Sequence, residues 1–436
     1  MIFSKNFLRH GTRLAAVLAA ICWPATAQNI PSPNQHLPEW LDLGVEARSR
    51  TEFRSNINNQ SDLNDTINWT RLRLNVGVAA TPWLRFRFQG QDARVSGVAP
   101  WRTRTNVDYF DVREAYVSLG RSDQTQLHVG RQELAYGEDR LIGRRNWHNV
   151  DPSWDAARLV LRKGDYRFDA FSMAFVEVEE DHFDKLIQGN RLHGFYGQIG
   201  SWIPGGQVEP YLMYASQPRV NGVQDRGPDS GSYTAGVRLA GSATDWLEYD
   251  FELTGQRGHA RDIALRGWAT AESLTFGNND LPLQSRLGVL HDFASGGDSC
   301  EASRQFTFDP LHHARHKHLG MVDAVGRRNI HALTLSWEGR LHPRWRLRVN
   351  RLDFRLASRH DGLYGINGRQ SVAAPAEGAA SNKIGSEWDV LLRFTPIEGL
   401  TVEGGPGLFY PGGFLEQAIG EFSETKVIHL TIEMQL

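Results

Sequence analysis

Apolar and polar residues alternate with a period of two in many short segments of this chain. The segment WLEYDFELTGQ at residues 246–256 is one example. Its apolar set is Leu247, Tyr249, Phe251 and Leu253, and its polar set is Glu248, Asp250, Glu252, Thr254 and Gln256. Successive side chains of a β-strand point to opposite faces, so this pattern predicts a strand with one apolar and one hydrated face.

About 18 segments carry this alternation, whereas helix-period segments of comparable length are absent from the sequence. The alternating segments cover residues 41–48, 71–78, 84–89, 109–119, 125–133, 156–163, 165–177, 192–202, 207–216, 231–241, 246–256, 263–275, 283–293, 329–341, 343–356, 384–394, 398–410 and 424–436. Bacterial outer-membrane barrels contain about 8 to 26 strands, so this number is consistent with one large barrel.

The connections between these segments alternate in length. Short turns lie at residues 80–83, 120–124, 162–165, 242–245, 342–343 and 395–399. Long polar stretches lie at residues 54–68, 94–108, 134–155, 177–191, 217–230, 294–328 and 357–383. Short turns join successive strands into hairpins, and short periplasmic turns with long extracellular loops are typical of outer-membrane barrels. Trp83, Trp246 and Trp345 lie beside short turns and Trp388 follows a long stretch, as in an interfacial aromatic girdle.

Two architectures could use strands of this kind. A soluble sandwich buries the apolar face, whereas an outer-membrane barrel turns it to lipid and lines a watery lumen with the polar set. The charged faces of residues 69–77 and 246–256 suit either, and no fixed-period repeat indicates a propeller. The strand number and the hairpin rhythm favour the barrel. We therefore predict an all-β fold, a transmembrane antiparallel β-barrel of about 18 strands.

The two ends and the composition are consistent with an exported protein. Three basic residues precede an apolar run at 14–23, and an A-x-A site follows at 25–27. We predict a signal peptide over residues 1–27 and a single barrel domain over residues 28–436. A lipoprotein signal at Cys22 is disfavoured because Ile21 precedes it where a small residue is required. Beyond residue 28 no run approaches the roughly 20 apolar residues of a membrane helix.

Charge and cysteine content exclude two further classes. The chain carries 48 Lys plus Arg and 50 Asp plus Glu, a balance that argues against a nucleic-acid partner bound by bulk positive charge. After signal-peptide cleavage Cys300 would be the one remaining cysteine, so no intramolecular disulfide is expected.

Several motifs resemble the alginate-export family of outer-membrane porins. They are DVREAYVSLG at 111–120, LHVGRQEL at 127–134, YGEDR at 136–140, DAARL at 155–159, FTFDPL at 306–311, LG at 319–320, VGRRNI at 325–330, GSEWDV at 385–390 and GLFYPG at 407–412. The resemblance covers about residues 40–415, and its most specific block contains Gly130-Arg131-Gln132.

The resemblance implies a monomeric 18-stranded barrel in the outer membrane of a Gram-negative bacterium. It further implies that a polyuronate, alginate, passes through an arginine-lined lumen during secretion. Two features depart from the family pattern. The chain ends on Glu433-Met434-Gln435-Leu436 rather than on an aromatic residue, and a His-rich run follows the Asp309-Pro310 turn.

Candidate pore residues follow from the chemistry of a polyanion. Each carboxylate that loses hydration requires donors, and the arginine fork can meet a carboxylate with two hydrogen bonds. On the lumen phase the arginines are Arg48, Arg71, Arg73, Arg85, Arg87 and Arg158, and the acidic residues are Glu248, Asp250 and Glu252. A functional arginine ladder and a mixed-charge wall that only keeps the lumen wet both remain open.

The resemblance adds four candidates, Arg113 with Glu114 and Arg131 with Gln132. Both arginines share their phase with apolar neighbours that would face lipid. A charge at mid-bilayer on the lipid face costs about 2–4 kcal/mol. We therefore expect each arginine either to lie beyond the hydrocarbon band or to be turned inward by a bulge.

The run LHHARHKHLG contains His312, His313, His316 and His318, a spacing that can bind zinc or nickel. We favour a solvated loop over a metal site, and expect no metal and no cofactor. Catalytic motifs such as G-x-S-x-G and H-E-x-x-H are absent from the sequence, so we do not expect an enzyme.

Our first hypothesis is an outer-membrane channel for an anionic polysaccharide such as alginate, or for a smaller anionic solute, with outer-membrane lipid and periplasmic secretion proteins as partners. The alternative is a general or catabolic solute porin on the same scaffold. A barrel enzyme is the third hypothesis, and it predicts a clustered acid/base or Ser/His site at one rim.

Overall fold

A computed structural model describes residues 33–56, 64–97, 106–200, 202–220, 223–225, 227, 229–297, 303–420 and 423–436. The predicted signal peptide and Cys300 lie outside these residues. Within the described part of the chain, the main sheet contains 19 strands. Eighteen of them form the wall of a closed antiparallel barrel, and β16 (Arg304–Gln305) is a short parallel addition to β14. The predicted fold class is therefore confirmed.

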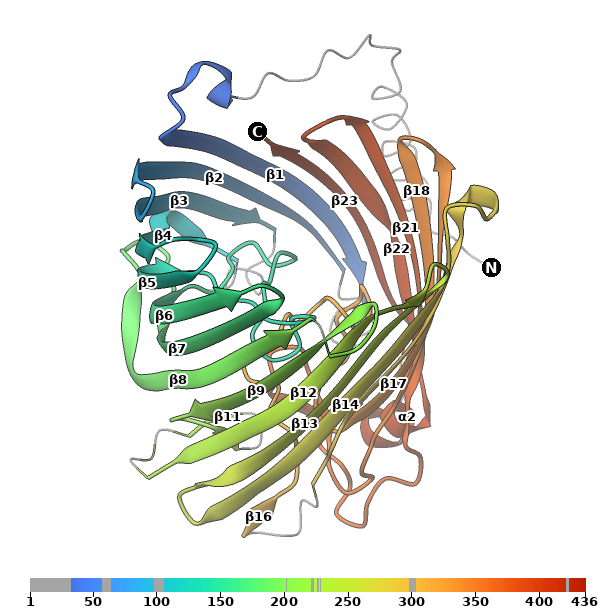
Figure 1. The fold of residues 1–436 in the computed structure, drawn as a ribbon. Helices are drawn as coiled ribbons and strands as arrows, with labels where there is room; N and C mark the ends of the chain where they lie inside the picture. Colours follow the sequence, from blue (N-terminus) through green and yellow to red (C-terminus); the bar gives the residue numbers. More distant parts are fainter. Residues whose placement is uncertain are drawn as a thin grey trace.

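The wall strands follow one another in chain order (Figure 1). They are β1 (Leu41–Ser55), β2 (Asp65–Thr81), β3 (Leu84–Ser96), β4 (Asp108–Gly120), β5 (Thr125–Gln132), β6 (Trp154–Lys163), β7 (Tyr166–Glu177), β8 (Lys185–Ile199), β9 (Gly206–Ala215), β12 (Gly231–Thr244), β13 (Leu247–Ala260), β14 (Ile263–Gly277), β15 (Arg286–Ala294), β17 (Ile330–His342), β18 (Trp345–Arg355), β21 (Lys383–Ile397), β22 (Leu400–Pro411) and β23 (Thr425–Gln435).

The remaining elements are small and lie in the connections. The short strands pair as two hairpins, β10 (Arg219–Val220) with β11 (Val223–Gln224) and β19 (Leu363–Tyr364) with β20 (Gln370–Val372). The helices are η1 (Pro33–His36), η4 (Pro282–Gln284) and α2 (Gly413–Ile419). No helix in the described ranges is long and apolar enough to cross a membrane.

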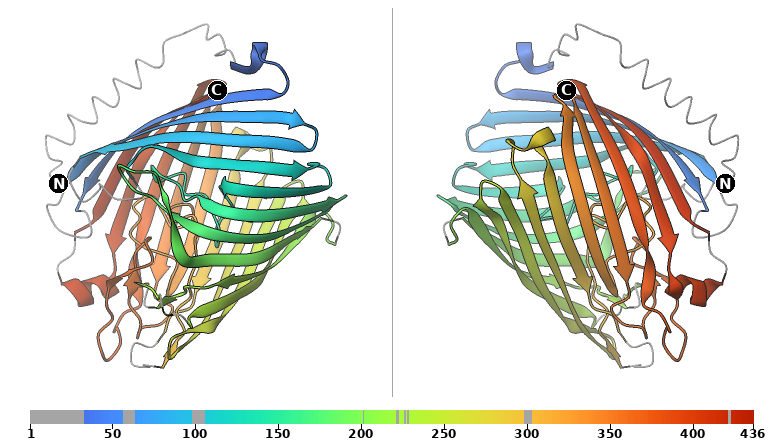
Figure 2. Two further views of the ribbon diagram at one scale, coloured as in Figure 1. Left: turned by 90° about the vertical axis from the view of Figure 1, so that its left-hand side faces the viewer. Right: turned by 90° about the vertical axis from the view of Figure 1, so that its right-hand side faces the viewer.

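The barrel closes between its first and last strands. β1 pairs with β2 on one side and with β23 on the other, and the β1–β23 register runs without a shift from Glu46↔Gln435 to Ser55↔Lys426. The last strand therefore has a regular register although it ends without an aromatic residue. Long connections gather at the end of the barrel opposite the C-terminus (Figure 2).

The two faces of the wall follow the predicted alternation. On β2, Leu72 and Leu74 are both 43% exposed on the outside, whereas Arg71 and Arg73, which alternate with them, are buried on the inside. Trp83 and Trp246 are half-exposed beside short turns, where an interfacial girdle would lie. The apolar residues of the alternation therefore form the outer surface.

The lumen is not watery throughout, which corrects the expectation of a polar inner face. Two connections fold into the ring of strands: residues 133–153, called the first inner loop, and residues 303–329, called the second inner loop (Figure 1). Their apolar side chains, Ile142 and Leu319 among them, share one buried cluster with wall residues such as Met173 and Phe354. At this level the inward set becomes apolar because it packs against the loops.

Candidate functional site

The two inner loops are joined to each other by their main chains. Ile142 forms a parallel β-bridge with His312, and the Ala314 N–H donates to the Asp139 carbonyl at 2.8 Å. Since both loops also pack on the wall, they act as one unit that narrows the lumen.

Arginines of β1 hold the main chain of the first inner loop. Arg48 donates to the carbonyls of Asn146 and, at 2.8 Å, His148. Arg50 donates to the carbonyl of Trp147, and its guanidinium lies 4.0 Å from the centre of the Trp147 ring. These two buried guanidinium groups are thus bound by the loop and, for Arg50, also by Glu52 at 2.7 Å, and not by bulk water.

A carboxylate of the same loop meets three more arginines. Arg73 Nη2 lies 2.7 Å from Asp151 Oδ2, and Arg113 Nη2 and Arg71 Nη1 lie 3.6 and 3.7 Å from the same oxygen. Burial alone would raise the pKa of Asp151, but the charges of Arg73, Arg113 and Arg71 outweigh that effect and hold the pKa below its ordinary value. Asp151 is therefore a fixed anion within a basic wall.

On the other side of the lumen, one arginine of the first inner loop, Arg140, contacts three carboxylates of the barrel wall. Arg140 Nη1 lies 3.2 Å from Asp250 and 3.5 Å from Glu252, and Arg140 Nε lies 3.9 Å from Asp292. Arg238 of β12 also pairs with Asp250. The loop therefore presents an anion to the basic wall and a cation to the acidic wall.

The His-rich run is partly buried where the second inner loop packs against the first, so it is not the fully solvated loop that was expected. His313 is 4% exposed, and the His316 ring stacks on Trp147 with centroids 3.8 Å apart. His318 Nε2 hydrogen-bonds the Glu138 carbonyl at 2.7 Å. In the described residues, the one group of three or more potential ligands that converge is an acidic one, Asp108, Asp111 and Asp184, and no histidine belongs to it.

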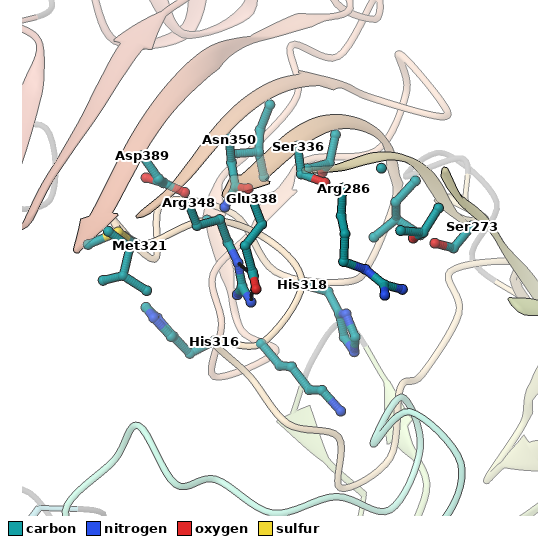
Figure 3. A pocket seen from close by; sticks show the side chains of 18 of the residues that line it. Ser273, Arg286, His316, His318, Met321, Ser336, Glu338, Arg348, Asn350 and Asp389 are labelled. Atoms are coloured by element: carbon teal, nitrogen blue, oxygen red, sulfur yellow. Dashed lines mark hydrogen bonds and ion pairs between the residues drawn. The ribbon is translucent and has the colours of Figure 1, made fainter. Parts of the chain in front are cut away.

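Two neighbouring cavities lie against the inner loops. One, of about 240 Å³, has the basic lining residues Arg48, Arg50, Arg144, Arg145, Arg315 and Lys317 and the acidic lining residues Glu403 and Glu433. The other, of about 500 Å³, lies between the second inner loop and strands β14, β15, β17, β18, β21, β22 and β23. Figure 3 shows Arg286, Arg348 and Glu338 on the wall side of this second cavity, with His316 and His318 across from them.

The structure brings some predicted pore residues together and separates others. Arg48, Arg71 and Arg73 lie together on the buried basic wall, and Asp250 and Glu252 lie together on the acidic wall. The others lie nearer the short-turn end, where Arg85 is exposed, Arg87 is 2.9 Å from Asn75, Arg158 is 4.0 Å from Asp169 and Glu248 pairs with Arg286.

Arg113 and Arg131, whose phase would place them on the lipid-facing side, avoid the hydrocarbon band in two different ways. A register shift in the β3–β4 pairing turns Arg113 inward, where it is 5% exposed and pairs with Glu133. Arg131 stays on the outward phase near the long-loop end of β5, with Nε 3.0 Å from Asp155. A bulge and a position near the rim thus each prevent an unpaired charge in the lipid-facing band.

Their neighbours Glu114 and Gln132 both make main-chain contacts. Glu114 accepts a hydrogen bond from the Glu133 N–H at 2.9 Å. Gln132 is 1% exposed and donates to the Ala156 carbonyl at 3.2 Å. Both side chains therefore fix the base of the first inner loop.

Sequence reasoning missed the loop residues that meet the wall, notably Arg140, Trp147 and Asp151. One signal was available. In FDAFSMAF at residues 168–175 the alternation fails, because both phases contain apolar residues. A strand apolar on both faces is buried on both faces, which in a barrel requires something to fill the lumen.

A closed antiparallel barrel with an apolar outer band and a charged interior narrowed by inner loops is an outer-membrane channel. Solved structures of three Pseudomonas aeruginosa proteins share the fold. OpdQ matches with a TM-score of 0.60 at 11% identity, over 92% of this chain and 99% of its own. OccK11 (OpdR) matches with 0.58 at 13% identity, over 94% and 100%. The outer membrane protein opdK matches with 0.60 at 12% identity, over 91% and 98%. No curated protein matches the chain by sequence.

The family model for alginate export matches residues 39–428, and the chain belongs to the alginate export family. The family and the barrel fold are those of transport channels. Together with the structural relatives they indicate the outer membrane of a Gram-negative bacterium.

Proposed function

We propose that this channel passes an anionic polysaccharide of the polyuronate class, such as alginate, or a smaller anionic solute built from the same units. The observation that carries the proposal is the cavity of about 240 Å³ at the inner loops. Its lining contains six basic residues, Arg48, Arg50, Arg144, Arg145, Arg315 and Lys317, and two acidic ones, Glu403 and Glu433. A ring of like charge at a constriction favours ions of the opposite sign.

The chemistry of this lining suits carboxylates in particular. Arginine presents a planar fork of donors that can make two parallel hydrogen bonds to one carboxylate, and five of the six basic residues are arginines. Family membership supports the same substrate class. We expect the channel to need no cofactor and to act as a monomer.

The test is the reversal potential of the purified protein in a planar bilayer under a salt gradient. We expect anion selectivity, and we expect Arg144→Gln to weaken it because the Arg144 side chain is 53% exposed and lines the cavity. The matched control is Arg121→Gln, which removes a 63% exposed arginine from a short turn and should leave the reversal potential unchanged. A cation-selective wild-type channel would refute the proposal.

A second measurement separates a polymer channel from a channel for small solutes. Mannuronate oligomers of increasing length are added on one side while the ion current is recorded. If block strengthens with length, the path binds several successive uronates, as a polymer requires. If monomers and long oligomers block equally, the small anionic solute is the substrate.

A further inference from the structure

We propose that Asp151 is an internal ligand: its carboxylate fills a carboxylate-binding site formed by Arg71, Arg73 and Arg113, and a uronate carboxylate displaces it during transport. This inference rests on the proposed function, since it names how the same lumen would bind its substrate. It adds that, in the absence of substrate, the carboxylate of Asp151 occupies the substrate-binding site.

The geometry is that of a site built for an anion. All three guanidinium groups reach the single oxygen Oδ2 of Asp151, at 2.7, 3.6 and 3.7 Å, and each arginine is at most 5% exposed. Asp151 itself is 2% exposed. Buried charges are retained at such positions only when they are paired, so removal of one member leaves the others uncompensated.

The site has more donors than Asp151 uses. Among the described residues, the buried Nε atoms of Arg71 and Arg113 have no hydrogen-bond partner, and neither has Oδ1 of Asp151. A buried donor without a partner costs about 1–3 kcal/mol. The short aspartate side chain therefore satisfies the arginines incompletely, and a ligand with several oxygens would satisfy them better.

Charge balance couples the loop to the ligand. Glu46 pairs with Arg71, and Glu133 pairs with Arg113. Two of the three arginine charges are thus neutralised by residues outside the pair with Asp151, and the third is neutralised by Asp151. When Asp151 leaves this wall, the third arginine charge loses its carboxylate unless another anion takes its place.

The test is block of single-channel current by a mannuronate trimer in planar bilayers. In wild type the trimer must compete with Asp151, so its apparent affinity is reduced by the fraction of time for which the site is open. An open state populated at about 10% or less predicts at least about tenfold tighter block in Asp151→Asn. Asp151→Glu, which keeps the carboxylate, should remain close to wild type.

The matched control is Asp139→Asn. Asp139 belongs to the same loop and is also buried, at 7% exposed. Its partner is Lys317 at 2.9 Å and not the arginine site, and Lys317 keeps a second carboxylate, Glu138 at 3.1 Å, when Asp139 is neutralised. Its φ of 62° is tolerated by asparagine. Equal block of wild type and Asp151→Asn, or equal tightening in Asp139→Asn, would overturn the inference.

Failure of the inference differs from failure of the proposed function. If the wild-type channel is anion-selective but the trimer blocks it as strongly as it blocks Asp151→Asn, the proposed function stands and the internal-ligand inference is wrong. If the trimer blocks neither protein, the inference is wrong. The proposed function is tested separately by the reversal potential, and a cation-selective wild type would reject it.

A second readout does not depend on the folding of Asp151→Asn. Ser153, two residues beyond Asp151, is 5% exposed. In a Ser153→Cys protein that also carries Cys300→Ser, saturating trimer should raise the rate of thiol labelling about tenfold, because it shifts an open state populated at about 10% to nearly full population and so exposes the neighbours of Asp151. An unchanged labelling rate would overturn the inference.

Discussion

Replacing Arg140 by methionine removes the cation that ties the first inner loop to the acidic wall. Arg140 is 3% exposed and lies within 3.9 Å of Asp250, Glu252 and Asp292. Methionine has a similar volume, a shorter and flexible side chain and no charge, so the substitution removes the ion pairs while largely preserving the packing.

The free-energy cost of Arg140→Met depends on how many of the three carboxylates still have another cation as a partner. Asp250 keeps Arg238 at 2.8 Å, and Asp292 keeps Arg327 at 2.8 Å. Glu252, 8% exposed, has no second ion pair within the described part of the chain. Breaking a buried pair costs about 3–5 kcal/mol. Because one carboxylate loses its cation, we take about 3 kcal/mol, a shift of about 150-fold toward states in which the loop has left the wall.

The assay is single-channel conductance combined with the reversal potential. Arg140→Met should conduct more than wild type and should be more permeable to cations, because Glu252 then faces the lumen unpaired. The double variant Arg140→Met with Glu252→Gln should recover most of the wild-type conductance, since no charge is then left uncompensated. Arg121→Met breaks a solvent-exposed ion pair on a short turn, which contributes little to stability, and serves as the control. Wild-type conductance in Arg140→Met, or no recovery in the double variant, would refute the reasoning.

Two further predictions concern the wall and the loop. Gly130 has a φ of 128°, and a Cβ there would lie 2.8 Å from the Tyr116 Cα. Gly130→Ala should therefore reduce the fraction of folded, heat-modifiable barrel in gel electrophoresis. Gly255→Ala is the control and should not reduce it, because a Cβ at Gly255 would meet open space. Burial, with the charges of Arg315 and Arg145, lowers the pKa of His148 well below its ordinary value, so the packed loop holds His148 neutral. As pH falls below about 6.5 the displaced loop gains a proton that the packed loop cannot take, and packing should weaken by up to about 2 kcal/mol at pH 5. Conductance should therefore rise on acidification in wild type and rise less in His148→Gln.

The wall of the barrel could be predicted from the sequence because its physics is local. Each of the 18 alternating segments coincides with a wall strand, since one face of every strand must meet an apolar medium. The exceptions were informative. Arg113 and Arg131 broke the pattern, and a bulge turns the one inward while the other lies near the rim.

The inner loops could not be predicted in the same way because their contacts join distant parts of the chain. Arg48 meets the carbonyl of His148, and Arg140 meets Glu252 more than 100 positions away. Closure of the barrel brings these residues together, and a period of two carries no information about closure. The His-rich run shows the same limit, because its polar sequence indicated full exposure to solvent, whereas contact with the first inner loop partly buries it.

The arrangement also changes how lumen charge should be interpreted. Arg48, Arg71 and Arg73 stand on the lumen phase, as the alternation predicts, yet their charges are directed at the first inner loop and its Asp151. A buried cation paired with a fixed anion adds little to the field felt by a passing ion, because the two charges cancel at distances longer than their separation. Selectivity should therefore depend more on cations that line the cavity with exposed side chains, such as Arg144 and Lys317, than on the total number of inward arginines. In this view the arginines of the basic wall begin to attract substrate only when Asp151 leaves them, so the same charges that hold the loop at rest would bind the polymer during transport.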